Sequence, residues 1–501
     1  MNRVSDYIEL LSKKGLLLKT DVSEDVANIE IDCLTYDNRE VCGSALFVCK
    51  GAHFKAEYLH SSMANGAVAY VSEQVYEGVA SYILVSDVRV AMVYLAELFY
   101  DNAPSKVKSI GITGTKGKST TAFYLKAIMD SWLAAEGKPE SAIISSITTY
   151  DGVINEKSHL TTPEAIPLHR SFNNAYESGI THLVMEVSSQ ALKYDRVLGL
   201  NFDVACFTNI GLDHISPVEH ADFEDYFTSK LKIFDSCKVA CINTDAQHSD
   251  RVLEYAEGKC EIVTFGSSAD NTVCCSNIEK RGNATYFTVK TPEFSEEVCI
   301  TMPGIFNVSN ALAAIAMSYV LGIPKEHVIS SLRDARVNGR MLVYNSNDDK
   351  IAVIVDYAHN KMSFDAIFNS VSLEYPDRDV IAVFGCPGNK AISRRKDMGE
   401  SAGAHADYII LTEDDPAEEE IADINAEVVK YIGECKYDMV ENRGEAIHKA
   451  FFDYEAEKRV ILILGKGEET TQKRGTEFIT TPSDSEYTLM CLKEYEMRNG
   501  N

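Results

Sequence analysis

The segment Gly111-Ile112-Thr113-Gly114-Thr115-Lys116-Gly117-Lys118-Ser119-Thr120 constrains this chain most, because it joins a glycine-rich loop to a Lys-Ser pair. An apolar run from Val107 to Ile112 predicts a buried strand before the loop, and helical spacing of apolar residues predicts a helix from Thr120 to about Leu133 after it. In such a unit backbone N–H groups point at phosphate oxygens, and the helix N-terminus adds positive potential. We therefore predict a phosphate-binding loop in which Lys118 reaches the β- and γ-phosphates and Ser119 ligates Mg²⁺.

The loop departs from the usual Walker pattern, since Ile112 stands where that pattern has a glycine. A carboxylate is also needed to hold the metal, and Glu186, at the end of a predicted strand from His182 to Val187, has the expected position. A GTPase would need an N-K-x-D motif. The nearest string is Asn360-Lys361-Met362-Ser363, which argues against that class.

Buried strands alternate with helical segments through the rest of the chain, a pattern that predicts mostly parallel sheets covered on both faces. We expect an α/β protein of three domains: a smaller N-terminal α/β domain over 1–103, a central domain of the P-loop type over 104–338, and a C-terminal Rossmann-like domain over 339–501. The predicted strands are Ser44–Cys49, Ala67–Val71, Tyr82–Val85, Val107–Ile112, His182–Val187, Val204–Thr208, Val239–Asn243, Glu261–Phe265, Ile351–Val355, Val380–Phe384, Tyr408–Leu411 and Val460–Leu464.

Composition excludes several classes of protein. The net charge of −27 disfavours binding to nucleic acid or to anionic lipid. No apolar run reaches 18 residues, and residues 1–19 read as an amphipathic helix without the apolar core of a signal peptide, so we expect a cytoplasmic protein without membrane insertion. The 13 cysteines form no CxxC pair, which argues against a zinc site.

Six strings in order, TGTKGKST, EVSS, TNIGLDH, FNVSNALAA, NGRM and VDYAH, resemble those of the Mur ligase superfamily, from about residue 30 to residue 480. Within it the chain is most similar to the MurE type, through Leu160-Thr161-Thr162-Pro163, VFGC, Asp414-Asp415-Pro416-Ala417 and GKGEE at 465–469. The resemblance implies an ATP-dependent amide ligase of peptidoglycan precursor synthesis. Such an enzyme activates a carboxylate as an acyl phosphate, which an amino acid then attacks.

The resemblance also implies the catalytic and nucleotide-binding residues. Lys118, His214 and Lys230 are the expected catalytic residues. Two Mg²⁺ sites are implied, with ligands from Ser119, Glu186, His214 and Lys230, the last as an N6-carboxylysine formed with CO₂. The residues expected to bind ATP are Gly114, Thr115, Lys116, Gly117, Lys118, Ser119, Thr120, Asn307, Asn310, Arg340, Asp356 and His359.

The resemblance assigns the first domain and its neighbourhood to a UDP-linked muramoyl dipeptide. The residues implied are Asn38, Thr161, Thr162, Ser188 and Arg196. Asn38 stands where a serine is common in the family, so the uridine contact differs from the family pattern.

The amino-acid site carries the specificity. The residues implied are Lys390, Asp414, Asp415, Ala417, Gly465 and Glu469. MurE enzymes that use meso-diaminopimelate carry Asp-Asn-Pro-Arg, whereas this chain has Asp415 in place of the Asn and Ala417 in place of the Arg. A distal carboxylate would lose its cation and a distal ammonium would gain Asp415 and Glu469, so we predict L-lysine, with L-ornithine next.

Three features of the C-terminal domain leave the assignment of its binding residues open. Lys390 replaces a family arginine that holds the α-carboxylate, and Arg394 or Arg395 is an alternative for that contact. The DYAH string is followed by Asn360-Lys361 instead of Thr-Pro. In the acidic run Glu413–Glu420, the residues Glu418–Glu420 are expected to form a solvated surface.

Two rival functions have to be weighed against the ligase. A folylpolyglutamate synthetase of the same superfamily is disfavoured, because about 110 residues precede the phosphate loop here. A non-catalytic paralogue is disfavoured by intact Lys118, Glu186, His214 and Lys230. The expected partners are therefore UDP-muramoyl dipeptide, ATP and L-lysine, no nucleic acid, and a monomeric state.

Overall fold

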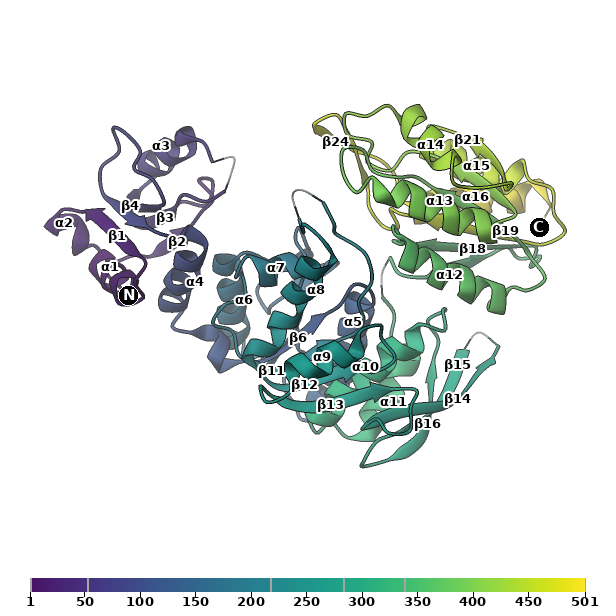
Figure 1. Cartoon of the computed structure of the whole chain (residues 1–501), viewed down its shortest axis with the longest axis horizontal. Coiled ribbons are helices and arrows are strands. Elements are labelled where there is room, and N and C mark those ends of the chain that lie inside the picture. Colours follow the sequence, from purple (N-terminus) through teal and green to yellow (C-terminus); the bar gives the residue numbers. More distant parts are fainter. Residues whose placement is uncertain (1, 52–53, 217–218, 283, 338, 501) are drawn as a thin grey trace.

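The computed structural model describes residues 2–51, 54–216, 219–282, 284–337 and 339–500. Three sheets follow one another along the chain, each covered by helices (Figure 1). The predicted α/β class with several domains is confirmed. The strands of the three sheets fall within the ranges 1–103, 104–338 and 339–501, while the boundaries themselves stay predictions.

The N-terminal sheet has five strands in the order β1-β5-β4-β3-β2. Its strands are β1 (Leu17–Asp21), β2 (Cys33–Thr35), β3 (Ala45–Val48), β4 (Ala67–Ser72) and β5 (Tyr82–Val85). Its helices are α1 (Val4–Lys13), α2 (Glu24–Ala27), α3 (Ala56–Ala64) and α4 (Val88–Phe99), and the 3₁₀ turn η1 (Ala103–Lys106) follows. The expected helix over 1–19 is too long: Gly15, at φ +71°, lies just after α1, and the apolar residues beyond it form β1.

The central sheet has eleven strands in the order β16-β15-β14-β13-β12-β11-β6-β10-β7-β8-β9. They are β6 (Lys108–Thr113), β7 (Ala142–Ile144), β8 (Thr148–Tyr150), β9 (Asn155–Lys157), β10 (His182–Glu186), β11 (Phe202–Phe207), β12 (Cys237–Asn243), β13 (Glu261–Gly266), β14 (Val273–Arg281), β15 (Ala284–Lys290) and β16 (Ser295–Ile300). The strands from β7 to β14 in this order are parallel, and antiparallel hairpins extend both edges. Because β6 lies between β10 and β11, the phosphate loop, Glu186 and the 208–214 segment all emerge at one edge.

Helices bury the apolar faces of this sheet. They are α5 (Lys118–Ala135), α6 (Ala165–Glu177), α7 (Ser189–Lys193), α8 (Phe223–Leu231), η2 (Lys232–Ser236), α9 (Ser249–Ala256), α10 (Asn307–Val320) and α11 (Lys325–Asp334). The helix expected from Thr120 to Leu133 is α5, and α10 packs beside it in the largest apolar core.

The C-terminal sheet has the order β17-β18-β22-β19-β20-β21, in which only β17 runs antiparallel to its neighbour. Its strands are β17 (Leu342–Asn345), β18 (Ile351–Asp356), β19 (Asp379–Phe384), β20 (Tyr408–Leu411), β21 (Lys436–Met439) and β22 (Arg459–Leu464), and a separate hairpin is formed by β23 (Thr471–Arg474) and β24 (Glu477–Thr480). Its helices are α12 (Lys361–Glu374), α13 (Ser393–His405), α14 (Ile421–Val429), α15 (Arg443–Phe452) and α16 (Asp484–Arg498).

Helix α12 lies on the side of the C-terminal sheet that faces the central part (Figure 1). At its N-terminus Asn360 donates a hydrogen bond to Asp213, and at its C-terminus Glu374 accepts from the Gly304 N–H at 2.9 Å. Both partners belong to the central part, so this one helix joins the two parts at both of its ends. Among the residues described, no helix is long and apolar enough to cross a membrane.

Candidate nucleotide and amino-acid site

The phosphate loop leaves β6 at Thr113 and enters α5 at Lys118, as the sequence predicts. Gly114 has φ +148° and Gly117 has φ +82°, values that favour glycine. A Cβ atom at Gly114 would collide with the Thr208 hydroxyl, and one at Gly117 would collide with the Asn310 amide oxygen. Both glycines are therefore required by close packing as well as by backbone conformation.

Two lysines converge on this loop. The Lys118 ammonium donates to the carbonyl oxygens of Gly114 at 2.9 Å and Thr115 at 3.2 Å. The Lys230 amine, from α8, donates to the same Gly114 oxygen at 2.9 Å. Burial lowers the pKa of Lys118, and burial together with the nearby Lys118 charge lowers the pKa of Lys230 well below its usual value.

Ser119 and Glu186 are brought together through a residue that sequence reasoning missed, Ser146. The Ser119 and Ser146 hydroxyls lie 3.0 Å apart, and Glu186 Oε1 accepts from the Ser146 N–H at 2.8 Å. Glu186 is buried at the end of β10, next to the loop strand. The group offers hydroxyl and carboxylate oxygens, the donors that Mg²⁺ prefers.

The segment from Thr208 to His214 holds the loop from its other side. The Thr208 hydroxyl and the Asn209 amide donate to the Lys116 carbonyl at 2.8 and 3.0 Å. The Thr115 hydroxyl contacts the Tyr226 hydroxyl at 3.0 Å. These bonds fix the backbone of the loop, and the position of Thr120, buried in the first turn of α5, follows from them.

His214 has φ +58°, and its Nδ1 atom contacts Glu219 at 2.8 Å. The Tyr226 ring contacts both expected metal ligands: its centroid lies 5.8 Å from that of His214 and 4.7 Å from the Lys230 amine. Within the described ranges no three His, Cys, Asp or Glu side chains are grouped so as to hold a metal. A second metal would need a further ligand at this place.

The residues expected around the nucleotide beyond the phosphates come from α10 and from the loops around β18. Asn310 donates to Asn307 at 2.8 Å and packs on Gly117. Asp356 accepts from the Met341 N–H at 2.8 Å, and burial raises its pKa.

Two side chains with ring or guanidinium nitrogens, Arg340 and His359, complete this group. The Arg340 guanidinium lies 4.9 Å from the centre of the Tyr357 ring. Burial and the Lys116 charge lower the pKa of His359 well below its usual value. Asn338, the first residue of the NGRM string, lies outside the described residues.

The residues expected to bind the muropeptide lie around a buried carboxylate, Glu164. The Thr162 hydroxyl donates to the Glu186 carbonyl at 2.9 Å and accepts from the Ser188 N–H at 2.9 Å. Arg196 pairs with Glu164 at 2.9 Å, and Lys50 from the N-terminal part pairs with it at 2.6 Å.

Two further candidates are less engaged. Thr161 lies beside Thr162, half-buried. Asn38 lies apart, in the N-terminal part, where its amide contacts Ser61 at 3.5 Å.

The expected amino-acid residues also gather, but around a residue not foreseen, Lys466. Its ammonium pairs with Asp415 at 2.8 Å and with Glu469 at 2.6 Å. Burial disfavours the ammonium, yet Asp414, Glu469 and Asp415 outweigh that effect and raise the Lys466 pKa. Asp415 and Glu469, the acids expected to meet a ligand ammonium, therefore already share the ammonium of Lys466.

The cluster nevertheless stays acidic. Burial raises the pKa of Asp414 to about 6, and Asp414, Asp415 and Glu469 face the Lys466 ammonium, while the Arg443 charge also lies close to Asp414. Gly465 permits this packing, because a Cβ there would collide with Asp414. The backbone of Ala417 forms a β-bridge with that of Arg474. The Arg474 guanidinium pairs with the buried Glu413 at 2.8 Å.

The two candidate substitutes for the family arginine differ sharply. Arg395 is buried and pairs with Glu419 at 2.8 Å and Glu427 at 2.6 Å, so it is committed to the fold. Arg394 pairs with Asp213 at 2.8 Å. Lys390 is exposed and forms no ion pair among the described residues.

The expectation of a solvated Glu419 is wrong, because its carboxylate accepts hydrogen bonds from Arg395 and from the Asn389 N–H.

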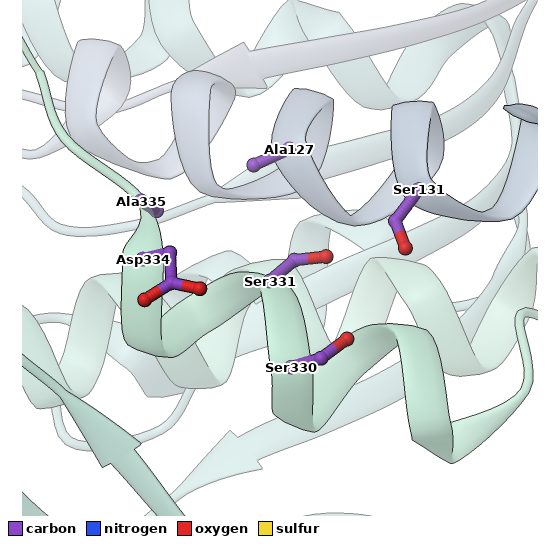
Figure 2. Close-up of a pocket in the computed structure, with 6 residues that line it drawn as sticks. All are labelled: Ala127, Ser131, Ser330, Ser331, Asp334 and Ala335. Atoms are coloured by element: carbon purple, nitrogen blue, oxygen red, sulfur yellow. The ribbon is translucent and has the colours of Figure 1, made fainter.

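One cavity lies elsewhere. It has a volume of about 340 Å³, and Figure 2 shows its lining residues on and beside α5 and α11: Ala127, Ser131, Ser330, Ser331, Asp334 and Ala335. Ala127 is nine residues beyond Lys118, roughly 13 Å along the helix axis. None of the predicted site residues lines this space.

Ser146, Asp213 and Lys466 are the members that sequence reasoning missed. Asp213 and Lys466 belong to two of the recognised strings, TNIGLDH and GKGEE. The sequence could therefore have pointed to both residues, but not to the groups with which they pair. Ser146 lies in no such string, and only the fold brings it to Glu186.

Fold and site together define an α/β protein with a glycine-rich loop of the phosphate-binding type, in which a second α/β part contacts the segment beside that loop. The Mur ligase middle domain matches residues 112–318, and the Mur ligase glutamate ligase domain matches residues 339–467. The chain is 38% identical to the UDP-N-acetylmuramoyl-L-alanyl-D-glutamate–L-lysine ligase of Enterococcus faecalis, over 93% of this chain and 92% of that one. It is 35% identical to the UDP-N-acetylmuramyl-tripeptide synthetase of Lactobacillus acidophilus, over 97% of both.

Solved structures share the fold at low identity. The MurF ligase of Thermotoga maritima in complex with ADP matches with a TM-score of 0.63 at 18% identity, over 93% of this chain and 98% of that one. A UDP-N-acetylmuramoyl-L-alanyl-D-glutamate–2,6-diaminopimelate ligase matches with a TM-score of 0.61 at 23% identity, over 95% and 100%. The chain belongs to the Mur ligase family, and the resemblance seen in the sequence is confirmed.

Proposed function

We propose that this chain is an ATP-dependent ligase that joins L-lysine to the D-glutamate γ-carboxylate of UDP-N-acetylmuramoyl-L-alanyl-D-glutamate. The observation that carries the proposal is the acidic cluster of Asp414, Asp415 and Glu469, which already holds one ammonium, that of Lys466. The relatives named as L-lysine ligases support it, since they match nearly the whole chain.

ATP would bind with its phosphates on the loop from Gly114 to Thr120. Lys118 would leave the carbonyls of Gly114 and Thr115 to reach the β- and γ-phosphates, because a phosphate is the stronger acceptor. Asn307, Asn310, Arg340, Asp356 and His359 would surround the rest of the nucleotide, as the family resemblance implies. Ser119 and Glu186 fit a Mg²⁺ ion, with Ser146 holding the carboxylate in place.

Lys230 fits conversion to a carbamate. A neutral amine attacks CO₂, forming an N–C bond and releasing one proton, and the lowered pKa of Lys230 favours that neutral form. The product would be an anionic oxygen ligand beside His214, the further ligand that a second metal needs. Two bound metal ions would stabilise the charge that develops on the transferred phosphoryl group.

The reaction then needs two displacements. The γ-carboxylate of the dipeptide attacks the γ-phosphorus of ATP, and ADP leaves, which gives an acyl phosphate. The amino group of L-lysine attacks the acyl carbon, loses a proton and expels phosphate. Lys118 and Lys116 lie where they can neutralise the oxygens that gain charge in both steps.

The muropeptide would be held between the N-terminal and central parts. Thr161, Thr162, Ser188 and Arg196 come from the central part, and Asn38, from the N-terminal part, would meet the uridine end. Arg196 carries the charge suited to a pyrophosphate or carboxylate.

The amino acid would lie between loop 388–390 and the acidic cluster. Lys390 is the exposed cation for its α-carboxylate. The cluster behind Asp415 is the place for its side-chain ammonium, and Ala417 itself carries no cation for a distal carboxylate. We also propose that the enzyme acts as a monomer in the cytoplasm.

The test is turnover by the purified chain. With ATP, Mg²⁺, UDP-N-acetylmuramoyl-L-alanyl-D-glutamate and L-lysine, we expect phosphate release and a product heavier by one lysyl residue, with each substrate required. Lys118→Ala should abolish turnover, and Lys396→Ala, at an exposed position of α13, should not. Phosphate release without the lysine adduct would refute the proposal.

A further inference from the structure

Asp213 connects the phosphate loop to the amino-acid loop. Its Oδ1 accepts from the Arg394 guanidinium at 2.8 Å and from the His214 N–H at 3.0 Å. Its Oδ2 accepts from the Asn360 amide and lies 3.7 Å from the Lys116 ammonium. Only 2% of this side chain is exposed, so both oxygens are saturated by protein groups.

The partners of Asp213 come from two parts of the molecule. Lys116 and His214 belong to the central part, whereas Asn360 begins α12 and Arg394 lies in the first turn of α13. The contact is extended by Met362, whose sulfur would collide with a Cβ added at Gly211. A single buried carboxylate thus holds the starts of two C-terminal helices against the segment that fixes the phosphate loop.

Charge makes this arrangement hard to replace. The Asp213 carboxylate lies 2.8 Å from the Arg394 guanidinium and 3.7 Å from the Lys116 ammonium. His214 and His359 also face it, and it is the carboxylate that keeps the Lys116 and Arg394 charges close together. Without it, Lys116 and Arg394 would repel each other across the junction.

We propose that Asp213 is a positioning residue that seats the amino-acid loop over the phosphate loop through Arg394. The expected effect on the KM for L-lysine rests on the proposed ligase function, whereas the expected effect on the contact between the central and C-terminal parts does not. Arg394 follows Lys390 by four residues, so fixing Arg394 fixes the place from which Lys390 meets the incoming α-carboxylate. Asp213 also contacts Lys116 of the phosphate loop. It therefore places the incoming amino acid close to the transferred phosphoryl group.

The test compares Arg394→Ala, Arg394→Lys and Asp213→Asn with Lys396→Ala as the matched control, an exposed lysine two residues further along α13. We expect Arg394→Ala and Asp213→Asn each to raise the KM for L-lysine about tenfold, a typical effect for a desolvated charge pair, with the KM for the muropeptide unchanged. Arg394→Lys should recover part of the loss. The double variant Asp213→Asn/Arg394→Ala should be no worse than the poorer single variant, because both remove one contact.

Small-angle X-ray scattering supplies a readout that needs no turnover. The radius of gyration should increase in Arg394→Ala and Asp213→Asn and stay at the wild-type value in Lys396→Ala. Unchanged scattering in both variants, or additive losses in the double variant, would overturn the proposal. If even the wild-type chain fails to use L-lysine, the ligase assignment fails, and the scattering result still decides whether Asp213 holds the two parts together.

Discussion

Replacing Asp415 by asparagine removes one charge from the proposed ammonium site while preserving its shape. Asp415 has φ +48°, a conformation that asparagine also tolerates. Its Oδ1 accepts from Lys466 at 2.8 Å and from the Lys473 N–H at 2.9 Å, and the asparagine oxygen can keep both bonds. The change therefore isolates electrostatics from packing.

The magnitude follows from the charges around Lys466. Asp414, Asp415 and Glu469 raise the Lys466 pKa, and the variant keeps two of these three acids. A full charge pair about 4 Å apart is worth roughly 4 kcal/mol at an effective dielectric constant of about 20. Since the Asp415 side chain is 20% exposed and Lys466 opposes it, we take about 1.4–2 kcal/mol, which is roughly a tenfold to thirtyfold rise in KM for L-lysine.

The assay is phosphate release at saturating ATP and muropeptide with varied L-lysine. We expect kcat to stay within about twofold, because the side-chain ammonium is bound equally before and during the reaction. Glu420→Gln, an exposed acid of the same run, is the control and should leave KM unchanged. A wild-type KM in Asp415→Asn, or the same rise in Glu420→Gln, would refute the charge argument.

Three other expectations concern the loop, the modified lysine and pH. Gly117→Ala should abolish ATP binding measured by calorimetry, because the added Cβ collides with Asn310 at a φ of +82°; wild-type affinity would show that the loop tolerates it. Removal of CO₂ should lower activity and bicarbonate should restore it, whereas Lys230→Arg should be inactive and insensitive to bicarbonate; equal activity with and without CO₂ would speak against the carbamate. Burial lowers the pKa of His169 to about 4 in the folded chain, whereas the pKa in the unfolded chain is about 6.5. Between these two pH values His169 is protonated in the unfolded chain and neutral in the folded chain. The free energy of unfolding should therefore fall by up to about 1.4 kcal/mol per pH unit on acidification. His169→Leu should flatten that slope in denaturant titrations, and an unchanged slope would exclude His169 as its source.

The strands that the sequence predicted are those with continuous apolar runs. Tyr408–Leu411 and Tyr82–Val85 agree residue for residue with the structure, because a strand buried on both faces shows in its own residues. Strands β14 and β15 escaped prediction. They are half-exposed hairpin strands, and polar residues such as Glu279 interrupt their apolar pattern.

The phosphate loop was predictable because its signal is local: the glycines, the lysine and the flanking elements are consecutive. The amino-acid site is not local. Lys466 and Asp415 are 51 residues apart, and their charges are read separately in a sequence. The partners of Arg394 and Arg395 could not be read from the sequence for the same reason, since one lies 181 residues away, another lies on α14 and the third just before α14.

A competition experiment measures the central claim most directly. The purified chain is given ATP, Mg²⁺, CO₂ and UDP-N-acetylmuramoyl-L-alanyl-D-glutamate with equal concentrations of L-lysine, L-ornithine and meso-diaminopimelate, and the product masses are read together. We expect the lysine adduct to dominate, the ornithine adduct to be minor and the diaminopimelate adduct to be at background. A dominant diaminopimelate adduct would contradict the assignment of the acidic cluster, and no adduct of any of the three would contradict the ligase function itself.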